Sequence, residues 1–239
     1  MGLLDNNTVL REMLRSGIAL DEQGEAHPLH SHIPERFAEA LYHTVLARRP
    51  ELVVEVGMAM GCSTLAILTA LQEIGGTGRL LSIDPYQPAY KNCGLAAVRH
   101  AGLGARHEHI AEPDFIALPR LLAAGTRVDL AYIDGNHTFD FALLDFWYLD
   151  RMIPVGGVVA FNDCAMPAVH KVIKFVLTHR RYVEVDVGLK ASYADYSRVR
   201  GAIRRLTGAK PQTFYRNFAD RYFRKLENWE PKWDFFASF

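Results

Sequence analysis

The chain has 239 residues, which fits one large domain with additions, and its 27 Lys and Arg residues balance its 27 Asp and Glu residues. Zero net charge argues against a nucleic-acid partner, because neutralising phosphates requires a basic stripe or tail. Hydrophobic residues make up 49% of the chain and charged residues 23%, a composition that excludes general disorder. No apolar stretch approaches the ~20 residues of a membrane-spanning helix, so we expect no membrane partner.

The three cysteines, Cys62, Cys93 and Cys164, are odd in number and widely spaced. This usage is typical of small buried side chains in a reducing compartment and not of a disulfide framework or a zinc site. The first residues contain no basic region followed by an apolar one, so no secretory signal is evident. We therefore expect a cytoplasmic protein.

Short β-rich segments alternate with helical patterns from Glu51 to about Val187, as in βαβ units around a parallel sheet. The sequence predicts strands over Glu51–Val56, Arg79–Ile83, Arg106–Ile110, Val128–Ile133, Pro154–Phe161, Tyr182–Val187 and roughly Tyr193–Arg200. It predicts helices over Cys62–Glu73, Ala89–His100, Pro113–Ala124, about Thr138–Met152 and Pro167–His179. The expected fold is therefore a doubly wound α/β sheet of about seven mostly parallel strands.

Two segments flank this core, so we divide the chain into a cap (1–34), a core domain (35–200) and an aromatic C-terminal extension (201–239). The cap contains a short helical pattern at Val9–Arg15 and then three histidines in a loop-like stretch. We interpret these histidines as ordinary loop residues, with a ligand role as the alternative.

Apolar residues between Phe214 and Trp229 fall on one half of a helical wheel and charged residues on the other, which predicts an amphipathic helix. Such a face must pack against the core, a second subunit or the substrate site, and its mixed charges argue against a membrane surface. We expect a homo-oligomer in which residues 211–239 contribute to the interface.

A buried strand runs into a glycine turn at Gly57 and Gly61, and a helix follows whose N-terminal N–H groups can face an anionic group. Asp84 ends the next strand, where a carboxylate can bind ribose hydroxyls. Ala59 and Cys62 replace the second and third glycines of the dinucleotide fingerprint. This argues against an NAD-linked oxidoreductase and favours a ribose-containing ligand without a pyrophosphate.

The segment Glu55-Val-Gly-Met-Ala-Met-Gly-Cys-Ser-Thr, followed by Asp84, resembles motif I and the ribose-binding acid of class I S-adenosylmethionine-dependent methyltransferases. The Ser-Thr pair after the turn is similar to the metal-dependent catechol-type and natural-product-tailoring O-methyltransferases. The resemblance covers roughly His32 to Val187 and implies a Rossmann-like methyltransferase core. It implies that S-adenosylmethionine is bound by Glu55, Gly57, Met58, Gly61, Ser63, Asp84, Glu112 and Asp134.

Asp134 follows the strand predicted at 128–133, and Asn162 and Asp163 follow the one predicted at 154–161. Neighbouring parallel strands lie ~4.8 Å apart and end at one edge of the sheet, so these side chains can converge. Their oxygens suit Mg²⁺, and the catechol-type pattern likewise has metal ligands here, although its Asp-Asn pair is reversed in this chain. The alternative is that the two acids only cap the following helices.

His137 follows Asp134 at the offset where the catechol-type enzymes carry a lysine base, so the resemblance implies that His137 is the general base. A neutral imidazole can accept a hydroxyl proton near pH 7, and the alternative is a histidine at the rim of a helix. The predicted function is Mg²⁺-assisted methyl transfer to a hydroxyl of a small-molecule acceptor: a sugar, a polyketide or a phenolic. The rival functions are a non-catalytic nucleoside-binding scaffold and, less favoured, an NAD-linked oxidoreductase.

Overall fold

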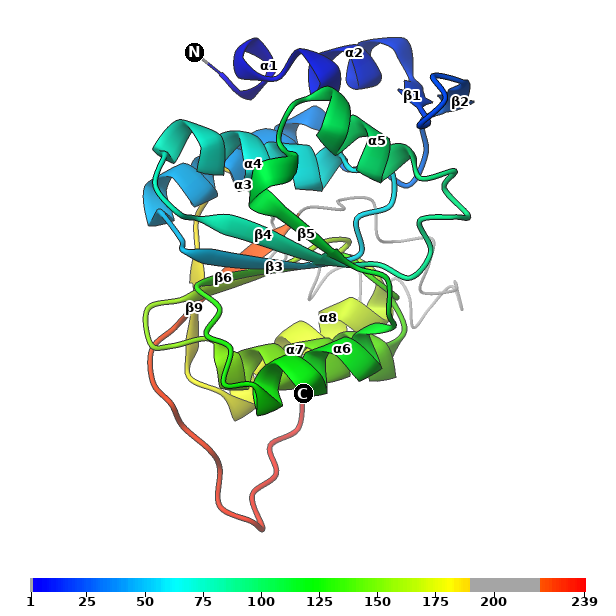
Figure 1. Ribbon diagram of the computed structural model, residues 1–239. Coiled ribbons are helices and arrows are strands. Elements are labelled where there is room, and N and C mark those ends of the chain that lie inside the picture. The colour runs from blue at the N-terminus through cyan, green and yellow to red at the C-terminus, as the bar shows by residue number, and fades with distance from the viewer. Residues whose placement is uncertain (1, 190–219) are drawn as a thin grey trace, which may run out of the picture.

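The computed structural model describes residues 2–189 and 220–239. Its centre is a seven-stranded sheet with the strand order β5-β4-β3-β6-β7-β9-β8 (Figure 1). The strands are β3 (Leu52–Val56), β4 (Arg79–Ile83), β5 (His107–Ile110), β6 (Leu130–Ile133), β7 (Val158–Phe161), β8 (Tyr182–Val185) and β9 (Arg221–Lys225). The first five are parallel to one another, and β9 is antiparallel to both β7 and β8. This topology confirms the predicted doubly wound, mostly parallel sheet.

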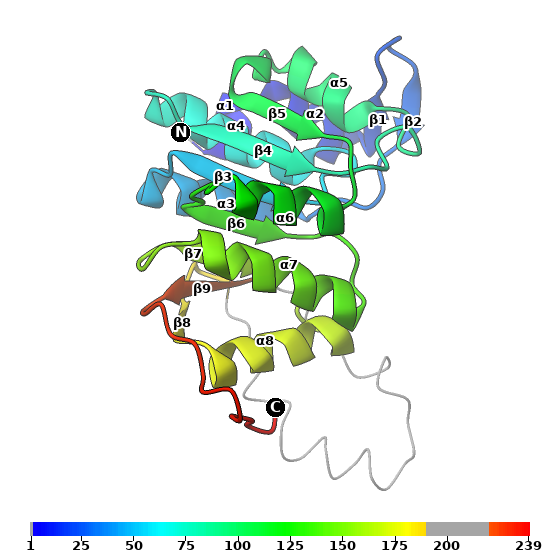
Figure 2. The ribbon, with the colours of Figure 1, turned by 60° about the horizontal axis from the view of Figure 1, so that its bottom comes forward.

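Helices cover both faces of the sheet: α3, α4 and α5 lie above it in Figure 1, and α6, α7 and α8 lie below it (Figures 1 and 2). Their bounds are α3 (Glu35–Arg48), α4 (Cys62–Ile74), α5 (Cys93–His100), α6 (Asp114–Ala123), α7 (Phe139–Met152) and α8 (Pro167–His179). Two clusters of buried apolar side chains fill the layers between the sheet and these helices. Strand β3 is buried along its whole length, as the apolar run of a central parallel strand predicts.

The N-terminal segment forms a third layer outside α4 and α5 (Figure 1). It consists of α1 (Leu3–Asn6), α2 (Thr8–Ser16) and a hairpin of β1 (Ile18–Leu20) and β2 (Ala26–Pro28). Helix α2 confirms the helical pattern predicted at Val9–Arg15, whereas the hairpin and α3 were not predicted. Among the described residues, no helix has the length and apolar character needed to cross a membrane.

The predicted amphipathic helix at the C-terminal end is wrong over Arg221–Lys225, which forms strand β9 between β7 and β8. Tyr222 and Phe223 are both fully buried, and they belong to the two clusters on opposite faces of the sheet. Successive side chains of a strand point to opposite faces, so this apolar pair fits a strand covered on both sides. The predicted strand Tyr193–Arg200 and the start of the predicted helix, from Phe214, lie outside the described residues.

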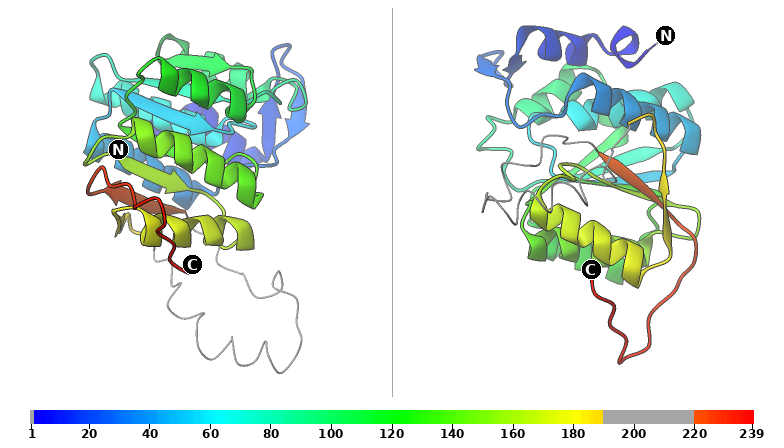
Figure 3. Two further views of the ribbon diagram at one scale, coloured as in Figure 1. Left: turned by 90° about the horizontal axis from the view of Figure 1, so that it is seen from below. Right: turned by 180° about the vertical axis from the view of Figure 1, so that it is seen from behind.

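The residues after β9 pass the C-terminal end of α8, and the C-terminus lies beside this helix (Figures 2 and 3). The His179 ring of α8 contacts the rings of Phe235, Phe236 and Phe239 at centroid distances of 5.4, 5.9 and 5.2 Å. Part of the aromatic extension therefore packs on its own chain, while Trp233 is 97% exposed.

Candidate functional site

The turn between β3 and α4 depends on two glycines. Gly57 has φ +84°, and a Cβ added there would lie 2.3 Å from the carbonyl oxygen of Asp134. Gly61 precedes the first residue of α4 with φ +88°, and a Cβ there would lie 3.0 Å from the Cα of Gly94. Both positions combine a left-handed backbone with a close approach, so only glycine fits without movement of the neighbouring backbone. The turn therefore lies directly against the residues that follow β6.

Asp84 at the end of β4 holds this turn in place. Its Oδ2 accepts hydrogen bonds from the backbone N–H groups of Met58 (3.1 Å) and Ala59 (2.9 Å), and from Nε2 of Gln87 (3.0 Å). Its Oδ1 accepts one bond, from the N–H of Tyr86 at 2.7 Å. A carboxylate oxygen has two acceptor positions, so Oδ1 retains capacity for a ligand. Asp84 thus has a structural role that its position in the sequence does not reveal.

Glu55 lies behind the turn and is fully buried. Its Oε2 accepts hydrogen bonds from the hydroxyls of Thr64 and Ser82, both at 2.7 Å, while Oε1 has no partner among the described residues. Burial is the main cause that raises the pKa of Glu55 to about 7, and the nearby charge of Asp134 adds to it. Glu55 therefore links β3, α4 and β4 and is protonated at slightly acidic pH.

The Glu55→Gln variant is expected to change the pH dependence of stability. The folded-state pKa of about 7 lies above the ordinary 4.5, so the contribution of Glu55 is greatest below pH 4.5 and falls as the pH rises through 7. At 1.36 kcal/mol per pKa unit, the free energy of unfolding of the wild type should fall by up to about 3 kcal/mol relative to the variant between about pH 5 and pH 8.

Urea unfolding at several pH values measures this difference, and a pH-independent cost of the buried amide does not affect it. The matched control is Glu108→Gln on the edge strand β5, whose side chain is 56% exposed. A constant difference between wild type and Glu55→Gln at every pH would contradict the assignment.

A cavity of about 370 Å³ opens at the carboxyl ends of the strands β3, β4 and β6. Among the predicted cofactor-binding residues, Gly57, Asp84 and Asp134 line it. The other predicted residues on and around the glycine turn do not line it: Glu55, Met58, Gly61 and Ser63. They are buried behind the turn.

The wall toward β5 and α6 differs from the prediction. Glu112 forms an ion pair with Arg120 at 2.8 Å and does not line the cavity. Asp114, two residues further on, lines it together with Phe115 and Phe141. The sequence signal for Asp114 was its position just after Pro113, at the first residue of the helix, because that position presents a carboxylate at the edge of the sheet.

Three side chains converge at the end of the cavity that Asp134 lines. Asp134 and His137 follow β6, and Asp163 follows β7. One ligand atom of each lies within 4.8 Å of the others. His137 Nε2 is 3.5 Å from Asp134 Oδ1 and 3.4 Å from Asp163 Oδ2. Asp163 has φ +49°, a left-handed conformation that is uncommon for a residue other than glycine and that is found often at functional sites. The structure thus brings together the predicted base and two of the predicted metal ligands.

Electrostatics couple the three groups. Burial raises the pKa of Asp134 to about 6, and the charge of Asp163 adds to this while His137 opposes it. Burial also raises the pKa of Asp163, and the charge of His137 opposes this rise. Burial lowers the pKa of His137, but the hydrogen bond and charge of Asp134 and the charge of Asp163 outweigh it, and the net direction is upward. The cluster therefore favours a positive charge between the two carboxylates.

Asn162, the third predicted metal ligand, is held from behind. Its Nδ2 donates to Oδ1 of Asp220 at 2.8 Å, and the hydroxyl of Tyr132 donates to Oδ2 of the same carboxylate, also at 2.8 Å. Asp220 is 2% exposed and immediately precedes β9. The C-terminal extension thus contributes a residue to the support of the site, which the helical interpretation of this segment did not foresee.

The donor set fits a divalent cation. Two carboxylates and one imidazole nitrogen point at one another, and the contacts of His137 Nε2 to Asp134 and Asp163, at 3.5 and 3.4 Å, are long for hydrogen bonds. Asn162 offers only its Oδ1, since its Nδ2 is occupied by Asp220. Oxygen ligands suit Mg²⁺, and an imidazole nitrogen also suits Mn²⁺ or Fe²⁺.

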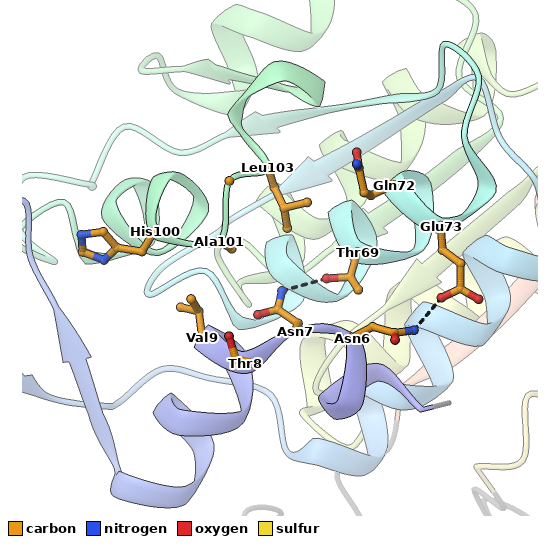
Figure 4. Close-up of a pocket in the computed structure, with 11 residues that line it drawn as sticks. Asn6, Asn7, Thr8, Val9, Thr69, Gln72, Glu73, His100, Ala101 and Leu103 are labelled. Atoms are coloured by element: carbon orange, nitrogen blue, oxygen red, sulfur yellow. Dashed lines mark hydrogen bonds between the residues drawn. The ribbon is translucent and has the colours of Figure 1, made fainter.

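A second cavity, of about 590 Å³, lies between the N-terminal helices, α4 and the end of α5 (Figure 4). Asn7 donates to the hydroxyl of Thr69 (2.8 Å) and Asn6 to Glu73 (2.7 Å), so these bonds tie the N-terminal segment to α4. None of the predicted site residues lines this cavity.

Residues 54–164 match a family model described as a methyltransferase domain. The match spans the glycine turn, the end of β4 and the sites after β6 and β7. It confirms the expected methyltransferase domain. No curated protein matches the chain.

Solved structures share the fold at low sequence identity. An O-methyltransferase from Bacillus cereus in complex with SAH has a TM-score of 0.61 at 15% identity, over 75% of this chain and 83% of that one. The SAH-bound methyltransferase PaMTH1 from Podospora anserina has 0.62 at 14%, over 94% and 92%. The O-methyltransferase TomG from Streptomyces achromogenes, involved in tomaymycin synthesis and solved with SAM, has 0.58 at 14%, over 95% and 100%. These similarities confirm the Rossmann-like methyltransferase fold.

Proposed function

This chain carries a methyltransferase domain, and we propose that it transfers a methyl group from S-adenosylmethionine to a hydroxyl group of a small-molecule acceptor. The observation that carries the proposal is one continuous arrangement at the edge of the sheet. The cavity extends from Asp114 past Asp84 and Gly57 to Asp134. Asp134 itself belongs to the cluster with His137 and Asp163. The cavity proposed for the nucleoside thus ends beside the cluster proposed for the chemistry.

The cofactor would lie across the strand ends. The glycine turn at Gly57 would allow close approach of the ligand to the backbone, and Asp84 Oδ1, which accepts one hydrogen bond from Tyr86, would accept another from a ribose hydroxyl. The rings of Phe115 and Phe141, which meet edge to face at a centroid distance of 5.9 Å, offer an apolar wall for a flat base. This orientation directs the sulfonium methyl group toward Asp134, where the cluster begins.

In the reaction, the acceptor oxygen forms a bond to the methyl carbon while the carbon–sulfur bond of the sulfonium breaks, which leaves S-adenosylhomocysteine. The acceptor proton passes to His137 Nε2. Displacement of this type depends on alignment of the reacting atoms, so positioning supplies much of the rate acceleration. Proton removal by an imidazole adds to it.

A divalent cation, Mg²⁺ in the first instance, would be held by the carboxylates of Asp134 and Asp163 and by Oδ1 of Asn162. When bound, it would lower the pKa of an acceptor hydroxyl. Support for this proposal comes from the convergence of the carboxylate oxygens of Asp134 and Asp163.

The acceptor class that we propose is a sugar, polyketide or phenolic hydroxyl. Methyl transfer from S-adenosylmethionine to a panel of these compounds tests it, with S-adenosylhomocysteine release as the measured product. Binding of the cofactor without any turnover across the panel would favour the rival function, a non-catalytic nucleoside-binding scaffold. A shift in thermal stability with NADH but not with S-adenosylhomocysteine would favour an oxidoreductase.

Asp84→Ala is expected to weaken S-adenosylhomocysteine binding by about 1.5–3 kcal/mol, the range for hydrogen bonds to a charged group. Isothermal titration calorimetry measures the affinity. Because Asp84 also holds the N–H groups of Met58 and Ala59, the variant should lose thermal stability as well. Gln87→Leu is the matched control, since it removes another contact to the turn but leaves the carboxylate. Unchanged affinity in Asp84→Ala would remove Asp84 from the cofactor site.

The oligomeric state of the chain depends on what covers its aromatic extension. The exposed ring of Trp233 and the 73%-exposed Phe236 support a homo-oligomer with the aromatic extension at its interface. Light scattering of the chain with both rings replaced by serine tests this, and an unchanged oligomeric state would contradict it.

The free, buried cysteines are compatible with a cytoplasmic location, which cell fractionation would test.

A further inference from the structure

Asp220 is a buried acid behind the candidate site, and the two groups that donate to it among the described residues are uncharged. Its Oδ1 accepts a hydrogen bond from Nδ2 of Asn162 and its Oδ2 accepts one from the hydroxyl of Tyr132, both at 2.8 Å. Asp150, another buried acid, shows the contrast, because its carboxylate lies 2.9 Å from Nε of Arg180. Burying a carboxylate without a cation is costly, so Asp220 requires an explanation.

Strand pairing places Asp220 against Asn162. The strands β6, β7 and β9 are neighbours in the sheet, and Phe161 is the register partner of both Ile133 and Arg221 (Figure 2). Asn162 follows β7 and Asp220 precedes the antiparallel β9, so the two residues continue this register by one pair. The backbone N–H of Asn162 also donates to the carbonyl oxygen of Ile133 at 3.0 Å. The contact between the two side chains is therefore built into the sheet.

The carboxylate of Asp220 determines which way the amide of Asn162 faces. An ionised carboxylate only accepts hydrogen bonds, so it selects the Nδ2 end of the amide and repels Oδ1. Burial raises the pKa of Asp220 to about 7, and the hydrogen bonds from Tyr132 and Asn162 oppose this rise, so the group is largely ionised at pH 8. Because the two ends of a planar amide point in different directions, Oδ1 is turned away from Asp220 and remains for a ligand.

The orientation of this amide matters to a cation. Asn162 directly precedes Asp163, one of the two carboxylates proposed to hold the cation. An amide oxygen is a suitable ligand for a hard cation, whereas an amide turned the other way presents N–H groups whose partial positive charge opposes it. One rotation of the amide therefore removes a ligand and adds a repulsive group.

We propose that Asp220 is a positioning residue, which holds the amide of Asn162 so that its Oδ1 is available to a divalent cation. Tyr132 supports it, because its hydroxyl binds the second oxygen of Asp220 and so holds the carboxylate in place. Strand β9 thereby contributes to the metal site although none of its residues lines the cavity. The inference rests on the cation of the proposed function.

Calorimetry with MnCl₂ at pH 8 tests the proposal on the full chain. Asp220→Asn keeps the size of the side chain, but only one acceptor oxygen remains, and the hydroxyl of Tyr132 occupies it. The new amide nitrogen then faces Asn162, which turns its own oxygen toward it and away from the cation. The Mn²⁺ affinity should fall by at least about 10-fold. The affinity for S-adenosylhomocysteine should stay within about 3-fold of the wild type, because Asp220 does not line the cavity.

The rescue variant exchanges the two side chains: Asn162→Asp combined with Asp220→Asn. The exchange keeps one hydrogen bond between an amide and a carboxylate, conserves the total charge, and offers a carboxylate oxygen in place of Oδ1. The Mn²⁺ affinity should return at least to the wild-type level. A loss that persists in the exchanged pair would overturn the proposal. This comparison decides even if Asp220→Asn alone does not fold.

A double-mutant cycle separates positioning from the charge of Asp220. In the background of Asn162→Ala there is no amide to hold, so adding Asp220→Asn should change the Mn²⁺ affinity by less than about 3-fold. If Asp220→Asn instead causes its full loss in this background, Asp220 acts through its charge or through the fold, and the proposal is wrong.

Tyr222→Phe is the matched control. Tyr222 is fully buried on β9, two residues after Asp220, and its hydroxyl has no hydrogen-bond partner among the described residues. Its removal should leave the Mn²⁺ affinity unchanged. Wild-type Mn²⁺ affinity in Asp220→Asn or in Asn162→Ala would overturn the inference and leave the proposed methyl transfer intact. Failure of the wild type to bind Mn²⁺ would remove the cation from the proposed function, and the inference with it.

Discussion

Replacing His137 by alanine is expected to lower kcat by about 10²–10⁴, the usual contribution of a general base, while the affinity for S-adenosylhomocysteine stays within about 3-fold of the wild type. The reason is geometric. Nε2 of His137 lies between the two carboxylates of the cluster and does not line the cavity, so its loss affects proton transfer and leaves cofactor binding in place. Steady-state kinetics with the best acceptor of the panel measures kcat.

The same variant separates two roles for the imidazole. If His137 is the base, His137→Ala should retain the divalent metal affinity of the wild type, measured by calorimetry with MnCl₂. If metal affinity and turnover are lost together, His137 is a ligand and the assignment as a base is wrong. His43→Ala is the control, because His43 is a largely exposed histidine on α3 with a similar carboxylate neighbour. A wild-type kcat in His137→Ala would exclude both roles.

The sequence predicted the place of the candidate site residues well where these residues follow the end of a strand. Gly57, Asp84, Asp134 and Asp163 each follow a buried apolar strand, and a parallel sheet places all such positions at one edge. The convergence of Asp134 with Asp163 therefore follows from the alternation of strands and helices alone. The addition of His137 follows from its short distance along the chain from Asp134.

Positions determined by side-chain packing were not predictable in the same way. Asp84 is engaged by the N–H groups of Met58 and Ala59, and nothing in the spacing of these residues indicates it. Asp114 replaces Glu112 in the cavity wall because the helix begins at Asp114 and directs this carboxylate inward, whereas Glu112 meets Arg120. The direction of a side chain at the start of a helix changes when the helix begins one residue earlier or later. A sequence pattern does not locate helix boundaries that closely.

Strand β9 shows a second limit of prediction from the sequence. Its two buried aromatic residues, Tyr222 and Phe223, are adjacent in sequence, and an apolar pair is compatible with both a helix and a doubly covered strand. The deciding contact is the pairing with β7, from Val158↔Arg224 to Phe161↔Arg221, which joins residues far apart in the chain. This pairing also places Asp220 beside Asn162 and Tyr132. A helical wheel compares only residues that are close in the sequence, so it could not reveal the pairing of β9 with β7.

Removal of divalent metal is expected to reduce turnover to background, and Mg²⁺ should restore it. Asp134 and Asp163 supply two of the oxygens that the proposed cation needs, and their ligand atoms already lie within 4.8 Å of His137. Asp163→Ala leaves too few protein oxygens for a hard, octahedral ion, so its metal affinity should fall by at least about 10-fold, with kcat falling in parallel. Calorimetry with the metal alone and kinetics after EDTA treatment measure the two effects.

The control for charge alone is Asp140→Ala, because Asp140 lies exposed in the first turn of α7, close in sequence to the cluster. It should leave metal affinity and turnover unchanged. Asn162→Ala distinguishes the two residues after β7: if Oδ1 of Asn162 is a ligand, the loss should approach that of Asp163→Ala, and if Asn162 only connects to Asp220, metal affinity should hold. Full activity in excess chelator would exclude the cation, and the two carboxylates would then act on the acceptor only through the charge and position of His137.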